Sequence, residues 1–164
     1  MFLNGNELTN RTATKIAEVL ADNNTHIKEI GLKWNKITAV GGNAIANALC
    51  ENRDLKVLDL SWNSIGVRPK DARNPNNPGK PIVVMKVGDI GNAWGKAFRM
   101  NKDLVHLDLS FNKISYEETE IIQDDIQSNS TMIGLHYLGN HGFCDKIVGK
   151  VDPLGFIQME DAAL

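Results

Sequence analysis

The sequence predicts an α/β solenoid in which one short strand and one helix alternate along the chain. Three observations support this prediction: a recurring phrase, an asparagine at a fixed place in each copy, and an apolar pair in the segment after each copy. Repeats of about 20 to 50 residues are typical of solenoids, because each unit buries its apolar face only against its neighbours. We expect residues 1–164 to form a single domain.

The phrase occurs four times in full and once in part. The copies are IKEIGLKWNKI at 27–37, LKVLDLSWNSI at 55–65, LVHLDLSFNKI at 104–114, MIGLHYLGNHG at 132–142 and the partial MFLNGNEL at 1–8. Their asparagines, 29, 28, 49 and 28 residues apart, are Asn6, Asn35, Asn63, Asn112 and Asn140. The interval of 49 is 21 residues longer than its neighbours, which indicates an insertion in an ordinary repeat.

Each phrase predicts a short strand that ends in a tight turn. In the copy at 55–65, Leu58 and Leu60 alternate with smaller or polar residues, so the leucines point inward. The asparagine has a short amide that bonds backbone groups which stacked turns leave unpaired. We expect strands near residues 1–4, 28–33, 56–61, 105–110 and 133–138.

Between the phrases, apolar pairs at i and i+4 place two side chains on one face of a helix. We expect helices near 10–23, 40–51, 89–101 and 117–128, carrying the pairs Ile16/Leu20, Ile45/Leu49, Trp94/Phe98 and Ile122/Ile126. Behind them, where a helix ends and a residue that tolerates left-handed backbone is favoured, stand Asn24, Asn52, Asn101 and Asn129.

The pattern LxxLxLxxNxI, with a full helix and a period of 28 to 29 residues, resembles the ribonuclease-inhibitor-like class of leucine-rich repeats over roughly residues 1–140. The resemblance implies a right-handed superhelix with parallel strands on a concave face and helices on a convex face. That class includes Ran GTPase-activating proteins, tropomodulin-type actin cappers, NOD-like receptor sensor domains and ciliary proteins. The resemblance therefore implies that the chain holds another protein.

The insertion falls at 67–87, within the third strand-helix repeat, and reads VRPKDARNPNNPGKPIVVMKV. It carries four of the five prolines and a net charge of +4, so the rest of the chain carries −6. A loop of this length is typical of functional or disordered segments. Two interpretations are open: a tolerated insertion, or a loop that binds an acidic partner through Arg68, Lys70, Arg73 and Lys80.

An aromatic residue precedes the turn asparagine in three successive copies, namely Trp34, Trp62 and Phe111. Stacked at the repeat spacing, these residues form a ridge at one rim of the predicted sheet. Two interpretations are again open. The rings serve as anchors of a protein interface, or they pack on one another and cover the turns.

The outward strand positions give the predicted concave face an acidic centre at Asp59 and Asp108, with His106 nearby. Carboxylates and histidines occur in catalytic sites, but no nucleophile accompanies them, so a solvated or partner-facing surface is favoured and no enzyme is expected. We expect no cofactor or metal, because the spacing of standard zinc sites is not matched by His136, His141, Cys144 and Asp145.

Charge and hydropathy point to a cytoplasmic protein that binds neither nucleic acid nor membrane. The formal net charge is −2, no apolar run approaches the roughly 18 residues of a membrane span, and no secretory signal is visible. Cys50 and Cys144 lie far apart in the sequence, as expected where thiols stay reduced.

The two ends depart from the repeat. Met1 occupies an inward leucine position, which leaves the first strand without a polar cap, and residues 141–164 are expected to form a C-terminal cap or extension. The ending GNHGFCD followed by Gly155 and Phe156 resembles endings of leucine-rich repeat proteins of ciliates and related protists.

The favoured function is a non-enzymatic protein-protein interaction scaffold or adaptor within a larger cytoskeletal assembly, in the finer interpretation a ciliary or axonemal one. Its partners would be other proteins of that assembly. Two alternatives stay open: a regulator of a small GTPase, similar to the Ran activators, and an actin pointed-end capper of the tropomodulin type.

Overall fold

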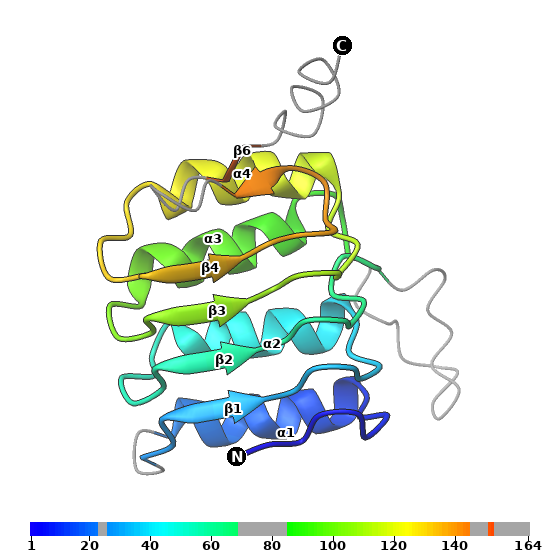
Figure 1. Cartoon of the computed structure of the whole chain (residues 1–164), viewed down its shortest axis with the longest axis vertical. Helices are drawn as coiled ribbons and strands as arrows, with labels where there is room; N and C mark the ends of the chain where they lie inside the picture. Colours follow the sequence, from blue (N-terminus) through cyan, green and yellow to red (C-terminus); the bar gives the residue numbers. More distant parts are fainter. Residues whose placement is uncertain (23–25, 69–84, 145–150, 153–164) are drawn as a thin grey trace.

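Strands and helices alternate in two layers in the computed structural model of the protein (Figure 1), which describes residues 1–22, 26–68, 85–144 and 151–152. One layer is a parallel sheet in the order β1 (Glu29–Gly31), β2 (Val57–Asp59), β3 (His106–Asp108) and β4 (Gly134–His136). The other layer contains α1 (Asn10–Ala21), α2 (Ala39–Leu49), α3 (Asp89–Met100) and α4 (Tyr116–Ile126). The predicted solenoid is confirmed.

The strands are shorter than the sequence pattern predicts, at three residues each. The strand predicted at 1–4 is reduced to a single parallel bridge between Phe2 and Gly31. Leu3 N donates to Gly31 O at 2.8 Å and Gly31 N donates to Met1 O at 2.9 Å. This segment has a sheet neighbour on one side only, so fewer backbone bonds hold it extended.

The core lies between the two layers. The inward leucines and isoleucines around β1, β2 and β3 and all four predicted helix pairs are buried, whereas Leu135 of β4 is partly buried. Leu60 and Leu109, at matching places in successive repeats, are both 0% exposed. Each strand-turn-helix unit, here called a coil, thus shares its apolar face with the coils beside it.

The asparagine after each strand, here called a turn asparagine, joins one coil to the coil before it. Asn63 Nδ2 donates to Leu60 O in its own coil and to Leu32 O in the preceding coil, both at 3.0 Å. Its Oδ1 accepts a hydrogen bond from Ile37 N at 3.1 Å. Asn35, Asn112 and Asn140 repeat this pattern. The amide therefore satisfies buried backbone groups that the short strands leave unpaired.

The same bonds continue across the long interval in the sequence. Asn112 Nδ2 donates to Leu60 O at 2.9 Å, although the two residues are 52 positions apart. Asn112 therefore bonds to the coil of Asn63 in the same way that Asn63 bonds to the coil of Asn35. The insertion boundaries at 67–87 stay a prediction, because residues 69–84 lie outside the described part of the chain.

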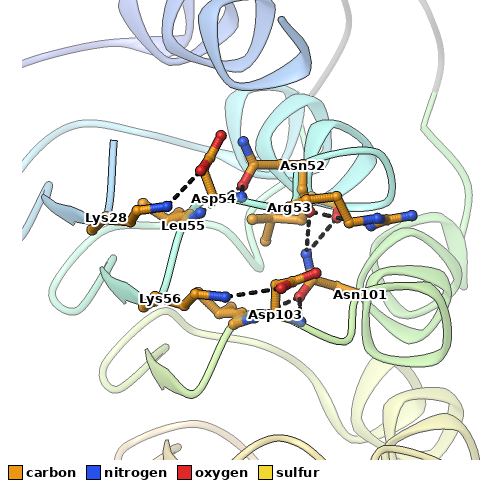
Figure 2. A network of polar contacts seen from close by, with 10 residues as sticks. Lys28, Asn52, Arg53, Asp54, Leu55, Lys56, Asn101 and Asp103 are labelled. Carbon is orange, nitrogen blue, oxygen red and sulfur yellow. Dashed lines mark hydrogen bonds and ion pairs between the residues drawn. The ribbon is translucent and has the colours of Figure 1, made fainter. Parts of the chain in front are cut away.

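A second asparagine column closes the opposite corner of each coil (Figure 2). Asn101 Nδ2 donates to Leu49 O at 2.7 Å and to Asn52 O at 3.0 Å, while its Oδ1 accepts bonds from Asp103 N and Leu104 N. The expectation of left-handed backbone here is wrong, since Asn101 has φ −80° and ψ 126°. The side-chain amide, rather than a left-handed residue, closes this turn. Asn52 and Asn129 bond in the same way, and Asn24 lies outside the described residues.

Lysine-aspartate pairs lie beside this second column (Figure 2). Lys56 Nζ lies 2.8 Å from Asp103 Oδ1, and Lys28 bonds to Asp54. The hydrogen bond from Lys28 lowers the pKa of Asp54 below its ordinary value. Because this pKa is depressed in the folded state, the stabilisation from this pair is present above the ordinary aspartate pKa and is lost as the pH falls through the lowered value.

The chain after β4 contains a short antiparallel pair, β5 (Phe143–Cys144) with β6 (Val151–Asp152), and β6 lies against α4. The C-terminal cap predicted at 141–164 includes this pair. Because residues 145–150 and 153–164 are not described, the cap as a whole stays a prediction.

Truncation of Leu60 to alanine should lower the free energy of unfolding by about 2 to 5 kcal/mol, because it leaves a cavity between coils. Urea denaturation followed by circular dichroism measures this loss. Leu138→Ala is the matched control, since Leu138 is 69% exposed and its loss should change stability by less than about 0.5 kcal/mol. Equal stability of Leu60→Ala and the parent chain would contradict the packing described above.

Candidate interaction surface

The outer face of the sheet, turned away from the helices, brings the predicted polar residues together. Asp59 and Asp108 are paired partners in the register of β2 and β3, and His136 pairs with Asp108 on β4. Each aspartate also accepts hydrogen bonds from the serine two residues after it. Asp59 Oδ1 accepts bonds from Ser61 N at 2.9 Å and Ser61 Oγ at 2.7 Å, and Asp108 Oδ1 accepts a bond from Ser110 N at 2.8 Å.

Two outward positions differ from the sequence expectation. Ser61 and Ser110 belong to the outward alternation, yet both are buried. Their carbonyls accept bonds from the residue before the turn asparagine of the preceding coil: Trp34 N donates to Ser61 O at 3.0 Å, and Trp62 N donates to Ser110 O at 2.9 Å.

His106 lies beside the aspartates, as the sequence predicts, and its ring contacts His136. The two ring centroids are 4.8 Å apart with a tilt of 36°. Gly134 makes room for this contact, because a Cβ there would lie 2.6 Å from His106 Nδ1. The two carboxylates and the two imidazoles together form a polar patch across β2, β3 and β4.

Trp34, Trp62 and Phe111 stack face to face at the rim of this sheet, and we call them the aromatic ladder. The ring centroids of Trp34 and Trp62 are 4.5 Å apart with 8° between the planes. Those of Trp62 and Phe111 are 4.1 Å apart with 18° between the planes. Trp34 is nevertheless 56% exposed and Trp62 39% exposed. The rings pack on one another and also face solvent, so the structure contains features of both interpretations and the binding role stays a proposal.

The ladder residues have left-handed backbone, which the sequence reading missed. Their φ angles are 57°, 57° and 56°. In the first and last coils the same position is occupied by Gly5 and Gly139, with φ of 68° and 78°. Glycine before the asparagine in those two copies was the available signal. For a bulky residue this conformation costs roughly 1 to 2 kcal/mol.

The turn asparagine imposes this conformation on the residue before it. Asn63 Nδ2 reaches back to Leu60 O at 3.0 Å and Ser61 O at 3.3 Å, so the chain must reverse at Trp62. The backbone amide of Trp62 is then bonded to Ser110 of the next coil. The ring is therefore held outward by a fixed backbone rather than by its own packing alone.

Arg68, which the sequence predicts to contact a partner, also lies close to a carboxylate of the domain, and its partner role stays a prediction. Its Nε lies 3.8 Å from Oε1 of Glu118, a residue of α4 with no exposed surface. The same carboxylate accepts bonds from Gly88 N at 3.0 Å and Gly91 N at 2.6 Å. Glu118 thus contacts residues on both sides of the segment 69–84, and no sequence pattern singled it out. Lys70, Arg73 and Lys80 lie outside the described residues.

The remaining reactive side chains form no site in the part of the chain that the structure describes. No group of three or more potential metal ligands gathers among those residues, and the side chains of Cys144 and Asp145 are not described. Burial raises the pKa of the Cys50 thiol above its ordinary value. None of the described helices has the length and apolar character to cross a membrane.

Fold and repeat pattern together define a leucine-rich-repeat solenoid. A family model described as Leucine Rich repeat matches residues 23–46, 51–68 and 101–117. A search of curated proteins finds no match. Among solved structures, "Leiomodin-1 Actin-Binding Site 2 (ABS2)" is similar, with a TM-score of 0.61 and 20% identity over 83% of this chain and 69% of that chain. At this identity the likeness shows the fold alone.

Replacement of Trp62 by glycine should give a more stable protein than replacement by alanine, by about 1 kcal/mol, because only glycine adopts the left-handed backbone without steric cost. Both variants lose the same stacking, so their difference reports the backbone. Val57, in β2 on the outer face, is the matched control: there glycine should be less stable than alanine by about 0.5 to 1 kcal/mol. Chemical denaturation of the four variants measures both differences, and the same order at both positions would contradict the left-handed assignment.

Proposed function

We propose that this chain is a non-enzymatic protein-binding module of a cytoskeletal assembly, and that the aromatic ladder and the adjoining polar patch receive the partner. The observation that supports this most is the exposure of three stacked aromatic rings on strained backbone. Strained residues persist where the surrounding structure enforces them, and they gather at functional sites. Large rigid aromatic side chains are also the anchors that dominate protein interfaces.

In this proposal the aromatic ladder and the polar patch have different roles in binding. Trp34, Trp62 and Phe111 provide apolar contact area with little side-chain freedom to lose on binding. Asp59, Asp108 and His106 give the neighbouring sheet face polar groups that select the partner. The cations Lys70, Arg73 and Lys80, together with Arg68, add a basic segment for an acidic part of the same assembly.

The finer proposal places the protein in the cytoplasm, in a ciliary or axonemal assembly, with repeats of the ribonuclease-inhibitor-like class. Its support is the repeat length and the C-terminal ending GNHGFCD. Actin binding is the second candidate. It is favoured by the similarity to the leiomodin-1 domain, whose title names an actin-binding site. A small-GTPase regulator stays a third possibility from the resemblance to Ran activators.

Site-specific photo-crosslinking tests the binding surface. A photoreactive phenylalanine analogue at Leu138, which is exposed on the outer face near the ladder, should crosslink to a partner in extract from the native source. The same analogue at Val19, exposed on α1, is the matched control. We expect a discrete crosslinked protein at Leu138 that mass spectrometry assigns to the cytoskeleton, and none at Val19. Crosslinks of equal yield at both positions, or at Val19 alone, would overturn the proposal.

Purified components separate the alternatives. Pointed-end elongation of actin filaments should be slowed by the chain if it is an actin capper, and Trp62→Ala should reduce this effect. Stimulated GTP hydrolysis by a panel of small GTPases would instead identify a regulator. Activity in neither assay, combined with a crosslink at Leu138 to another cytoskeletal protein, is the outcome that the leading proposal predicts.

A further inference from the structure

The two ends of the aromatic ladder differ. At the end nearest β4, a Cβ on Gly139 would lie 2.4 Å from Phe111 Cδ1, so the Phe111 ring covers that glycine. At the other end, a Cβ on Gly5 would meet no described atom within 4 Å. The rings therefore lean toward the C-terminal coil, and the place of a further ring in the first coil is empty among the described residues.

One consequence is that one face of the Trp34 ring has no ring of the ladder stacked on it. Trp62 is sandwiched between Trp34 and Phe111, and Phe111 lies between Trp62 and Gly139, but Trp34 has a ladder neighbour on one side only. The exposed fractions agree with this, at 56% for Trp34 and 39% for Trp62, with Phe111 partly buried. The ladder thus contains one stacking position for a planar group from outside.

The two carboxylates on the adjoining strands favour a cation. Outside residues 67–87 the chain carries a net charge of −6. Next to Trp34 the charges are mixed, because Lys33 precedes it and Lys36 pairs with Glu7. On the adjoining sheet face, however, Asp59 and Asp108 stand side by side in the register. The indole face is the aromatic surface that attracts cations most strongly, and a guanidinium group also stacks on it as a flat plate.

We propose that the unstacked face of Trp34 receives an arginine side chain from a basic segment of the partner, whose other cations face Asp59 and Asp108. This deepens the proposed function and rests on it. Arginine fits better than lysine because only arginine stacks as a plane, and better than an aromatic residue because Asp59 and Asp108 lie on the adjoining sheet face. The ladder would bind by adding one further layer to its own stack.

Four short labelled peptides test this inference on the full chain. They alternate glycine with arginine, lysine, citrulline or phenylalanine. Citrulline keeps the planar shape of arginine without its charge, and lysine keeps the charge without the plane. Fluorescence anisotropy should rank arginine first, with lysine and citrulline weaker by about three- to tenfold. The indole N–H resonance of Trp34 should shift on titration with the arginine peptide, and the resonance of buried Trp94 should not.

Three variants of the ladder locate the effect. Trp34→Leu should lower the affinity for the arginine peptide by about three- to tenfold, while Trp34→Phe keeps a ring face and should keep most of that affinity. Phe111→Leu is the matched control, because both faces of Phe111 are covered. Three results would overturn the inference. Phe111→Leu weakens binding of the arginine peptide as much as Trp34→Leu does, the citrulline peptide binds as tightly as the arginine peptide, or the phenylalanine peptide binds most tightly.

A further result separates this inference from the proposed function. If Trp34→Leu leaves the crosslink at Leu138 undiminished, the partner does not use the Trp34 face, and the arginine position is wrong while the protein-binding role stands. If crosslinking also fails in the parent chain, the proposed function itself is wrong.

Discussion

The hydrogen bonds of the turn asparagines are the interaction on which the rest of this structure depends. Three-residue strands provide few backbone bonds, and the chain leaves the sheet at a buried corner where further N–H and C=O groups need partners. The side-chain NH2 group of one asparagine donates to carbonyl oxygens in its own coil and in the preceding coil. Its side-chain oxygen accepts a hydrogen bond from a backbone N–H. Because each amide bonds to the coil before it, the stack has a fixed register from one coil to the next.

The same constraint explains why the long interval between Asn63 and Asn112 is compatible with the repeat. Asn112 meets Leu60 O with the geometry that Asn63 uses toward Leu32 O, although far more residues separate the first pair. The coil is therefore defined by its two asparagine corners and its core positions rather than by its length. Glu118 adds a third fixed point, since its buried carboxylate binds Arg68 on one side of residues 69–84 and Gly88 on the other.

The turn bonds also create the surface that we assign to binding. An asparagine that reaches back across two residues forces the residue between into left-handed backbone, for which glycine is the favoured choice. The first and last coils have glycine there, whereas the three middle coils have large aromatic residues that cost conformational energy. Stability alone does not favour this choice, although stacking offsets part of the cost. A rigid, exposed aromatic surface is the gain that accompanies it.

Sequence reading predicted the parts of the structure that follow from periodicity. Leu60 and Leu109 lie in the core, the helix pairs are buried, and the asparagine columns form both corners. Features that depend on local backbone geometry, or on contacts between residues distant in sequence, were not predicted. The burial of Ser61 and the pairing of Arg68 with Glu118 are not encoded in a repeating pattern. The left-handed backbone of Trp34 was signalled only by the glycines at the same position of the first and last copies. The residues of the proposed binding surface were thus visible in the sequence by type, but their conformation was not.

The measurement that tests the central claim most directly is the backbone conformation of the ladder in solution, with and without its asparagine. A short distance between amide proton and Hα within one residue, seen as a strong nuclear Overhauser effect, is the signature of left-handed backbone. The account predicts this signal at Trp34, Trp62 and Phe111 of the parent chain, and its loss at Trp62 alone in Asn63→Ala. A weak signal in the parent, or an unchanged one at Trp62 in the variant, would contradict the claim that the asparagine bonds set the ladder.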